Sequence, residues 1–149
     1  MTIQELVKEF VVLVLERENE LKDLSALIIA LDKLACSLND VSYEFDETDY
    51  PEVPENDYQV IRKIVEKRFP TLGYYNTSRD VSEHLETSEI IIGDAVDDIS
   101  DIVGDLLDVL WCFENTSKND ALWHFENSFR SHWGRHLREL QLYLHDKQW

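Results

Sequence analysis

The sequence predicts an all-α protein, folded as a single-domain, mainly antiparallel bundle of four or five helices. Two observations carry this prediction. Apolar residues recur at the three-and-four spacing of a buried helix face along almost the whole chain. With 149 residues and 44% hydrophobic content, the chain is also long enough to bury one core of its own. We therefore expect one domain over residues 1–149.

Residues 1–38 form the first part of the predicted bundle. Their apolar stripe comprises Ile3, Val7, Phe10, Val14, Leu21, Leu24, Ile28, Leu31, Ala35 and Leu38. This spacing fits either two helices or one long helix, since its phase runs through the polar segment at 17–20. We favour two helices with a turn near Asn19, because one helix of that length far exceeds the usual ~11 to 12 residues.

Two segments interrupt the helical pattern. Residues 40–57 contain eight acids, two prolines and no basic residue, and they predict an acidic loop. A third helix should follow from about Tyr58 to Phe69, where Pro70 stops it. Residues 70–87 have no apolar period and predict an irregular link.

The next predicted helix carries a row of aspartates. It begins after Asp94, a favourable N-cap, and five aspartates fall within an arc of roughly 80° beside its apolar stripe. This acid row comprises Asp94, Asp98, Asp101, Asp105 and Asp108. Like charges one turn apart cost about 0.2 to 0.5 kcal/mol per pair on an exposed helix, and more when partly buried. We therefore expect a cationic group opposite Asp101 and Asp105.

The last predicted helix supplies two histidines as candidates. Asn119 is its expected N-cap, and His132 and His136 lie one turn apart at the edge of its apolar stripe. If the link near 116–117 makes a tight antiparallel hairpin, Asp101 comes level with His132, and the acids one turn earlier come level with His136. The acids and the histidines then share one end of the hairpin.

The last third of the chain also resembles a known family. Residues 97–110 read DDISDIVGDLLDVL, and residues 120–145 read DALWHFENSFRSHWGRHLRELQLYLH. These segments are similar to the D-D-x-x-D-I-x-x-D-L and H-W-G-x-H motifs of an uncharacterised bacterial family known only as a domain of unknown function. The chain departs at 100–103, Ser-Asp-Ile-Val, where other members have Ala-Asp-Ile-Tyr. The resemblance implies an all-helical bacterial domain and implies no activity.

Three hypotheses explain the acids and histidines. The first is a structural clasp of Asp–His and Asp–Arg hydrogen bonds that locks the hairpin. Its clasp or core residues are Trp123, Phe129, Trp133, Gly134, Arg135 and His145. The second is a divalent metal site, because H-x-x-x-H and D-x-x-D each place two ligands on one helix face. Its candidate ligands are Asp98, Asp101, Asp105, His132 and His136. The third is an acidic surface that covers a basic partner protein.

Charge and motifs narrow the function further. The formal charge of −17 disfavours nucleic acid and anionic membrane surfaces as partners and attracts basic proteins or divalent cations. The longest apolar run, FVVLVL at 10–15, is too short to span a bilayer and lacks the flanks of a signal peptide, so we expect a cytoplasmic protein. Cys36 and Cys112 stand alone in apolar contexts and are interpreted as core residues.

The sequence contains no nucleophile elbow, phosphate loop or dinucleotide-binding motif. A non-enzymatic binding or structural role is therefore the first choice, and metal-dependent hydrolysis is the alternative. A divalent metal is the one cofactor that the pattern suggests, and the oligomeric state stays open.

Overall fold

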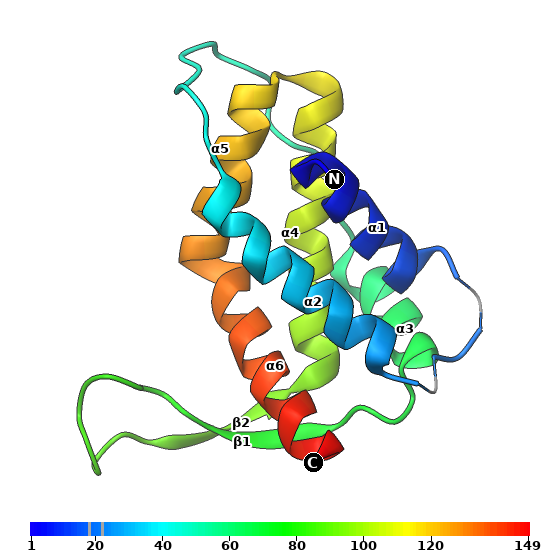
Figure 1. The fold of residues 1–149 in the computed structure, drawn as a ribbon, viewed down its shortest axis with the longest axis vertical. Helices are drawn as coiled ribbons and strands as arrows, with labels where there is room; N and C mark the ends of the chain where they lie inside the picture. The colour runs from blue at the N-terminus through cyan, green and yellow to red at the C-terminus, as the bar shows by residue number, and fades with distance from the viewer. Residues whose placement is uncertain (18, 22) are drawn as a thin grey trace.

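The computed structural model describes residues 1–17, 19–21 and 23–149, and most of them lie in helices (Figure 1). The α-helices are α1 (Ile3–Leu15), α2 (Ser25–Ser37), α3 (Tyr58–Arg68), α4 (Ala95–Asn115), α5 (Lys118–Ser128) and α6 (Gly134–Gln148). A short 3-10 helix, η1 (Leu38–Asp40), follows α2, and a π-helical segment, η2 (Phe129–Trp133), joins α5 to α6 without a break. Over the described residues the chain therefore forms five helical rods, within the predicted four or five.

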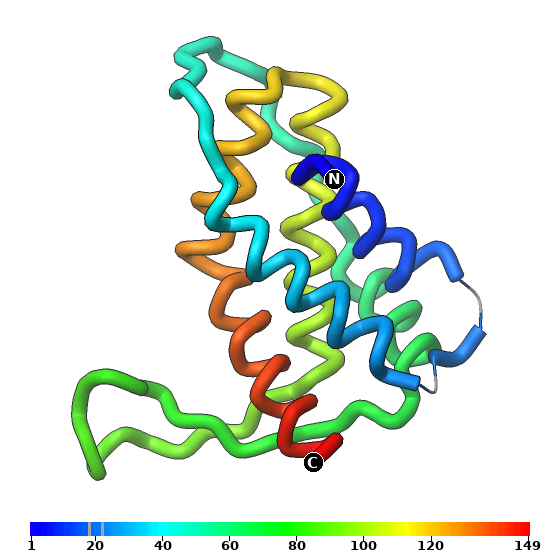
Figure 2. The backbone as a smooth tube through the Cα atoms, in the orientation of Figure 1, coloured from blue at the N-terminus to red at the C-terminus, as the bar shows by residue number. Residues whose placement is uncertain are grey.

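Helix α4 is the centre of the bundle. It contacts α1, α3, α5 and α6, and Figure 1 shows it in the middle of the molecule. The rod from α5 to α6 runs back along α4, and α2 runs back along α1, so neighbouring rods are mainly antiparallel (Figure 2). The fully buried Ile99, Ile102 and Leu106 of α4 pack into one cluster with apolar side chains of the other rods. Burial of these apolar faces against α4 stabilises the bundle.

The first two helices are separate. Helix α1 ends at Leu15 and α2 begins at Ser25, so the favoured prediction of two helices is confirmed. Thr2 caps α1 through a capping box with Glu5, in which each side chain bonds the other residue's backbone N–H.

Of the two N-caps predicted for the later helices, the structure has one and not the other. Asp94 caps α4 as predicted, because its side chain accepts hydrogen bonds from the backbone N–H groups of Val96 and Asp97. The prediction of Asn119 as the cap of the last rod is wrong. Ser117 takes that position, since its hydroxyl accepts from the Asp120 N–H.

The protein is not strictly all-α, and the predicted irregular link at 70–87 contains a strand. Strand β1 (Tyr74–Ser78) pairs antiparallel with β2 (Ile90–Asp94), which leads directly into α4. The two strands form a hairpin that extends from the lower end of the bundle in Figure 1. Tyr75 lies opposite Gly93, where a Cβ atom would overlap the tyrosine ring. The glycine thus allows Tyr75 to close over β2.

The acidic segment at 41–57 has no regular secondary structure, in agreement with its composition. It passes the end of the bundle where α4 meets α5 (Figure 2). Asp46 of this loop accepts hydrogen bonds from the hydroxyls of Ser117 and Tyr50, and Asn56 donates to Asp108 over 2.9 Å. These contacts fix the loop to α4 and to the start of α5.

The two cysteines differ in environment. Cys112 near the end of α4 is buried, but Cys36 is exposed, so the prediction of a core role for Cys36 is wrong. In the described part of the chain, no helix combines the length and the apolarity that crossing a membrane requires.

Two helical glycines provide a test of the packing. A methyl group at Gly134 would overlap the Phe129 carbonyl oxygen and ring, whereas one at Gly104 meets no atom within 4 Å. We expect Gly134→Ala to lower the free energy of unfolding by about 1–3 kcal/mol, as overpacking does. Gly104→Ala should raise it by roughly 0.5–1 kcal/mol, because alanine loses less backbone entropy in a helix. Urea denaturation of both variants measures the difference, and equal shifts would contradict this packing.

Candidate metal centre

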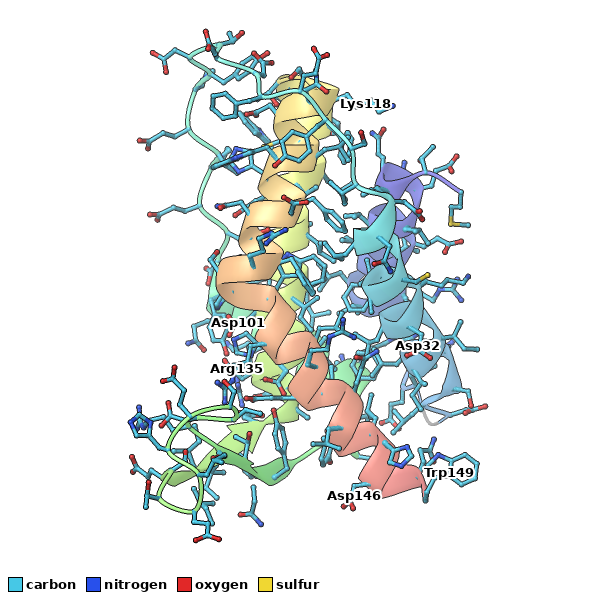
Figure 3. All side chains as sticks on the ribbon, turned by 60° about the vertical axis from the view of Figure 1, so that its left-hand side comes forward. Asp32, Asp101, Lys118, Arg135, Asp146 and Trp149 are labelled. Carbon is cyan, nitrogen blue, oxygen red and sulfur yellow. The ribbon has the colours of Figure 1, made fainter. Side chains whose placement is uncertain are left out.

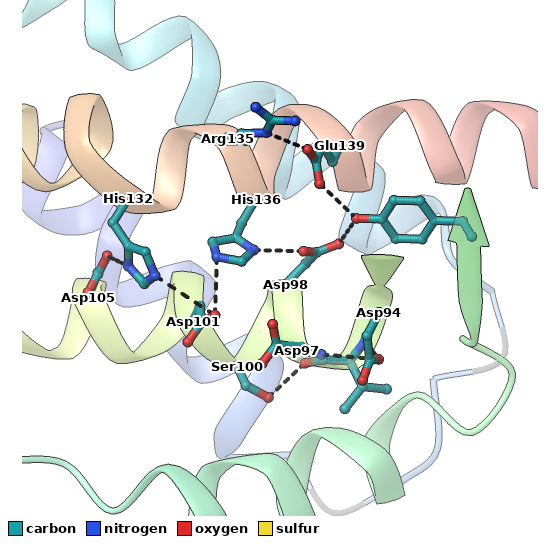
Figure 4. A network of polar contacts seen from close by, with 12 residues as sticks. Asp94, Asp97, Asp98, Ser100, Asp101, Asp105, His132, Arg135, His136 and Glu139 are labelled. Carbon is teal, nitrogen blue, oxygen red and sulfur yellow. Dashed lines mark hydrogen bonds and ion pairs between the residues drawn. The ribbon is translucent and has the colours of Figure 1, made fainter. Parts of the chain in front are cut away.

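Three aspartates of the acid row, Asp98, Asp101 and Asp105, face the two histidines of the last rod (Figure 4). His136 places Nδ1 2.7 Å from Asp98 Oδ1 and Nε2 3.1 Å from Asp101 Oδ2. His132 places Nδ1 2.7 Å from Asp105 Oδ2 and Nε2 3.9 Å from the same Asp101 oxygen. Both Nε2 atoms therefore approach the same oxygen of Asp101, while each Nδ1 atom is held by a carboxylate of its own, Asp98 for His136 and Asp105 for His132.

The hydrogen bonds indicate the tautomer of each neutral imidazole. A carboxylate can only accept, so Nδ1–H of His136 donates to Asp98 and Nδ1–H of His132 donates to Asp105. Without a metal, the Asp101 oxygen 3.1 Å from Nε2 favours the protonated ring of His136, and in the neutral tautomer each Nε2 presents its lone pair beside Asp101. A histidine that ligates a metal usually has this arrangement, because the second carboxylate orients the ring and raises its basicity.

Asp98, Asp101, Asp105, His132 and His136 form one cluster, and burial of this cluster opposes the ionisation of its carboxyl groups. The side chain of Asp98 is 4% exposed, and those of Asp101 and Asp105 are each 22% exposed. Burial raises the pKa of all three carboxyl groups, and the charge of Asp97 raises that of Asp101 further. Burial lowers the pKa of His136, but its hydrogen bond to Asp98 and the neighbouring carboxylates outweigh burial and raise it.

Tyr75 of β1 completes the surroundings of Asp98. Its hydroxyl donates to Asp98 and lies 3.4 Å from Glu139, and burial followed by the Asp98 hydrogen bond raises its pKa, so it stays protonated. Arg135 donates to Glu139 over 2.5 Å and to the backbone oxygens of Ser78 and Arg79. Sequence reasoning missed Tyr75 and Glu139, because Tyr75 lies in the segment expected to be irregular.

Helix α3 supplies partners for the first acids of α4. The Tyr58 hydroxyl donates to Asp97, and burial and this hydrogen bond raise its pKa to about 12. Arg62 Nη2 lies 2.7 Å from Asp94 Oδ2. No tyrosine or arginine of 58–69 was predicted to face the acid row, since nothing in a local pattern shows which helix packs beside it.

The other predicted clasp and core residues lie in three separate places. Trp133 is fully buried and donates from its indole nitrogen to Ser128 over 3.0 Å, and the Phe129 ring meets it edge-on at 4.8 Å. Trp123 instead packs edge-on against Phe45 of the acidic loop. His145 is exposed and borders a small cavity near the C-terminal end of α6. Among the described contacts, none joins Trp123 or His145 to the cluster of Figure 4.

The cluster is half-way along the molecule and beside a cavity. Figure 3 shows Asp101 and Arg135 near the middle of the bundle, with Lys118 at one end and Asp146 at the other. A cavity of about 320 Å³ is bordered by Asp101 and Asp105 of α4, by residues 53–56 and by Tyr58. A ligand in this cavity would meet the carboxylate on which the two histidines converge.

The fold and the cluster define a mainly helical bundle with paired aspartates and histidines between α4 and the last rod. The chain belongs to the family described as Domain of unknown function (DUF5063), which matches residues 1–148. The resemblance stated from the motifs is thereby confirmed. Among curated proteins, none matches this chain.

A solved structure shares the fold. Protein BF1032 from Bacteroides fragilis is 22% identical, with a TM-score of 0.75, and the match covers 98% of this chain and 89% of that one. At this identity the likeness extends to the fold alone.

The metal-free cluster yields a test of stability. His136→Ala leaves Asp98 with Tyr75 as its remaining side-chain partner, so we expect a loss of about 1–3 kcal/mol in the free energy of unfolding. His132→Ala should cost less, because its partner Asp105 is more exposed. Urea denaturation in the presence of a chelator measures the free energy of unfolding of both variants. His84→Ala, which replaces an exposed histidine, is the control and should stay within about 0.5 kcal/mol of the parent protein. A larger loss for His132→Ala than for His136→Ala would overturn this ranking.

Proposed function

We propose that this protein binds a divalent metal ion, with Zn²⁺ as the preferred ion and Asp101, His132 and His136 as its ligands. The observation that supports the proposal is that both nitrogens of each imidazole have a carboxylate beside them. Nδ1 of each ring contacts Asp98 or Asp105, and Nε2 of each ring points to Asp101. Asp98 and Asp105 are then the carboxylates that orient the ligating rings.

The spacing of the donor atoms is compatible with one ion. A tetrahedral zinc ion with ligands at about 2.0–2.2 Å separates its ligand atoms by roughly 3.3 Å. The two Nε2 atoms lie 3.1 and 3.9 Å from Asp101 Oδ2, and all three ligand atoms lie within 4.8 Å of one another.

The charge of the cluster also favours a dication. Asp97, Asp98, Asp101 and Asp105 surround two imidazoles. Four ionised carboxylates around two neutral imidazoles leave a large excess of negative charge in a partly buried site. A divalent cation held by the two Nε2 atoms offsets two of these charges without protonating the carboxylates, which burial otherwise favours.

Three protein ligands leave a coordination position open. In zinc enzymes such a position holds a water whose pKa the metal lowers to about 7. The cavity beside Asp101 would give a substrate access to that water. Metal-dependent hydrolysis is therefore the chemistry that this site would support if the protein is an enzyme.

Metal-dependent stability tests the proposal. We expect Zn²⁺ or Mn²⁺ to raise the melting temperature, with a gain of about 2.7 kcal/mol in unfolding free energy at 100-fold excess over the dissociation constant. His132→Ala should reduce the gain by the share that this site contributes, and His84→Ala, which removes an exposed histidine paired with Asp80, should retain the whole gain. An equal gain in parent and His132→Ala proteins would overturn the proposed ligand set.

Asp105→Asn separates ligation from orientation within the same experiment. This variant keeps the three ligands but weakens the hydrogen bond that orients His132, so metal affinity measured by calorimetry should fall about 10–100-fold. Asp108→Asn, the same change one turn along the acid row, should leave affinity close to that of the parent protein. Equal losses in both variants would indicate a general charge effect instead of a positioned ligand.

A second candidate function concerns the acidic loop. Six of its acids are exposed on a segment without regular secondary structure: Glu44, Glu47, Asp49, Glu52, Glu55 and Asp57. We propose that this loop is a docking surface for a basic protein, as the net charge of the chain predicts.

Binding of a lysine-rich peptide tests the docking surface. Replacing Glu47, Asp49 and Glu52 by their amides should weaken binding more than the same change at Glu83, Glu86 and Asp146, which are also exposed but lie elsewhere. Binding of the parent protein should also fall steeply between about 0.05 and 0.5 M salt, because the screening length shrinks several-fold. Equal effects of the two triple variants would contradict a loop-specific surface.

A further inference from the structure

A second cluster of metal-ligating side chains lies between α4 and α5, toward the end of the bundle marked by Lys118 in Figure 3. One donor atom each from Cys112, Asp120 and His124 lies within 4.8 Å of the other two. Cys112 comes from the last turn of α4, whereas Asp120 and His124 are one turn apart on α5. The three donors therefore converge across the hairpin.

The three donor residues line a cavity that could hold an ion. A cavity of about 300 Å³ is bordered by all three residues and, from the acidic loop, by Thr48 and residues 50–53. The side chain of Asp120 is 16% exposed and that of His124 is 36% exposed, while Cys112 is fully buried. An ion in the cavity would be shielded from bulk water on the side of the thiol and accessible on the side of the imidazole.

Two other roles for this cluster are weaker. Burial and the charge of Asp120 raise the pKa of Cys112 to about 11, so the free thiol is not a nucleophile at neutral pH. The His124 Nε2 and Asp120 Oδ2 atoms are 3.7 Å apart, which makes a long ion pair on a partly exposed helix and stabilises little. Neither role uses all three groups together.

We infer that Cys112, Asp120 and His124 form a second divalent metal site, independent of the first and selective for Zn²⁺ or a similar borderline-soft ion. One thiolate, one imidazole and one carboxylate are a donor set that zinc accepts, and harder ions such as Mg²⁺ disfavour the sulfur. Binding forms a metal–sulfur bond and releases the thiol proton to solvent, with no change of oxidation state. Glu52 of the loop borders the same cavity and offers a further carboxylate.

Cobalt(II) distinguishes this site from the first one. A thiolate bound to Co²⁺ produces a charge-transfer absorption in the near ultraviolet, which a site with only nitrogen and oxygen donors lacks. We expect the full-length reduced protein to show this absorption on addition of Co²⁺ and to lose it when Zn²⁺ is added. Cys112→Ser should abolish it, and Cys36→Ser, which removes the exposed cysteine of α2, should retain it.

His124→Ala provides a variant that leaves the buried cysteine in place. His124 is partly exposed, so the variant should fold, and Co²⁺ affinity read from the same absorption should fall at least about tenfold. His132→Ala should leave the absorption unchanged, because its site contains no sulfur.

The outcomes separate the two sites. No charge-transfer absorption in the parent protein, its survival in Cys112→Ser, or its loss in Cys36→Ser would each overturn the second site. If the absorption is absent while Zn²⁺ still stabilises the protein through His132, the second site fails and the first stands. If the absorption appears and His132→Ala leaves the Zn²⁺ stabilisation intact, the first site fails and the second stands.

Discussion

The structure depends on the pairing of Asp98 with His136, because α4 is both the central packing helix and the carrier of the acid row. Asp98 is almost completely buried at the point where α4 meets α6, and an unpaired carboxylate there would be strongly destabilising. The pair fixes the register of the last rod against α4. It also explains why Tyr75 must reach the same carboxylate, since one imidazole satisfies only one of its oxygens.

The surrounding elements follow from the division of α4 into an apolar face and a charged face. Buried residues such as Ile102 and Leu106 bind α4 to the core, while α3 and the hairpin approach its charged face with hydrogen-bond donors. The two-stranded sheet adds little to the core cluster, in which Tyr75 is only partly buried. The main contribution of the sheet is to bring the Tyr75 hydroxyl to Asp98. Glu139 of α6 contacts the same hydroxyl, and Arg135 of α6 donates to the Ser78 oxygen of β1.

The sequence predicts the features that depend on local periodicity and misses those that depend on distant contacts. Helical spacing predicts the rods, and spacing together with a short link predicts that acids near 98–105 meet His132 and His136. The sheet was missed because its strands are short and eleven intervening residues, 79–89, carry no tight-turn signal. The apolar neighbours of Cys112 along the chain predict a core residue. Its position close to His124 depends on how α5 folds back along α4, which a local pattern does not show.

The π-helical segment relates the two clusters of the last rod. His124 and His132 are eight residues apart, so in an uninterrupted α-helix they would point about 80° apart around the axis. Residues Phe129–Trp133 form i to i+5 hydrogen bonds, including that from the Gly134 N–H to the Phe129 oxygen, and such a segment accommodates one extra residue. The extra residue does not contribute its usual rotation of about 100°. The side chains of His124 and His132 therefore point in directions only roughly 20° apart around the axis. The same side of the rod can therefore meet Cys112 near one end of α4 and Asp101 further along it, and the absence of a side chain at Gly134 is what leaves room for the Phe129 ring beside this segment.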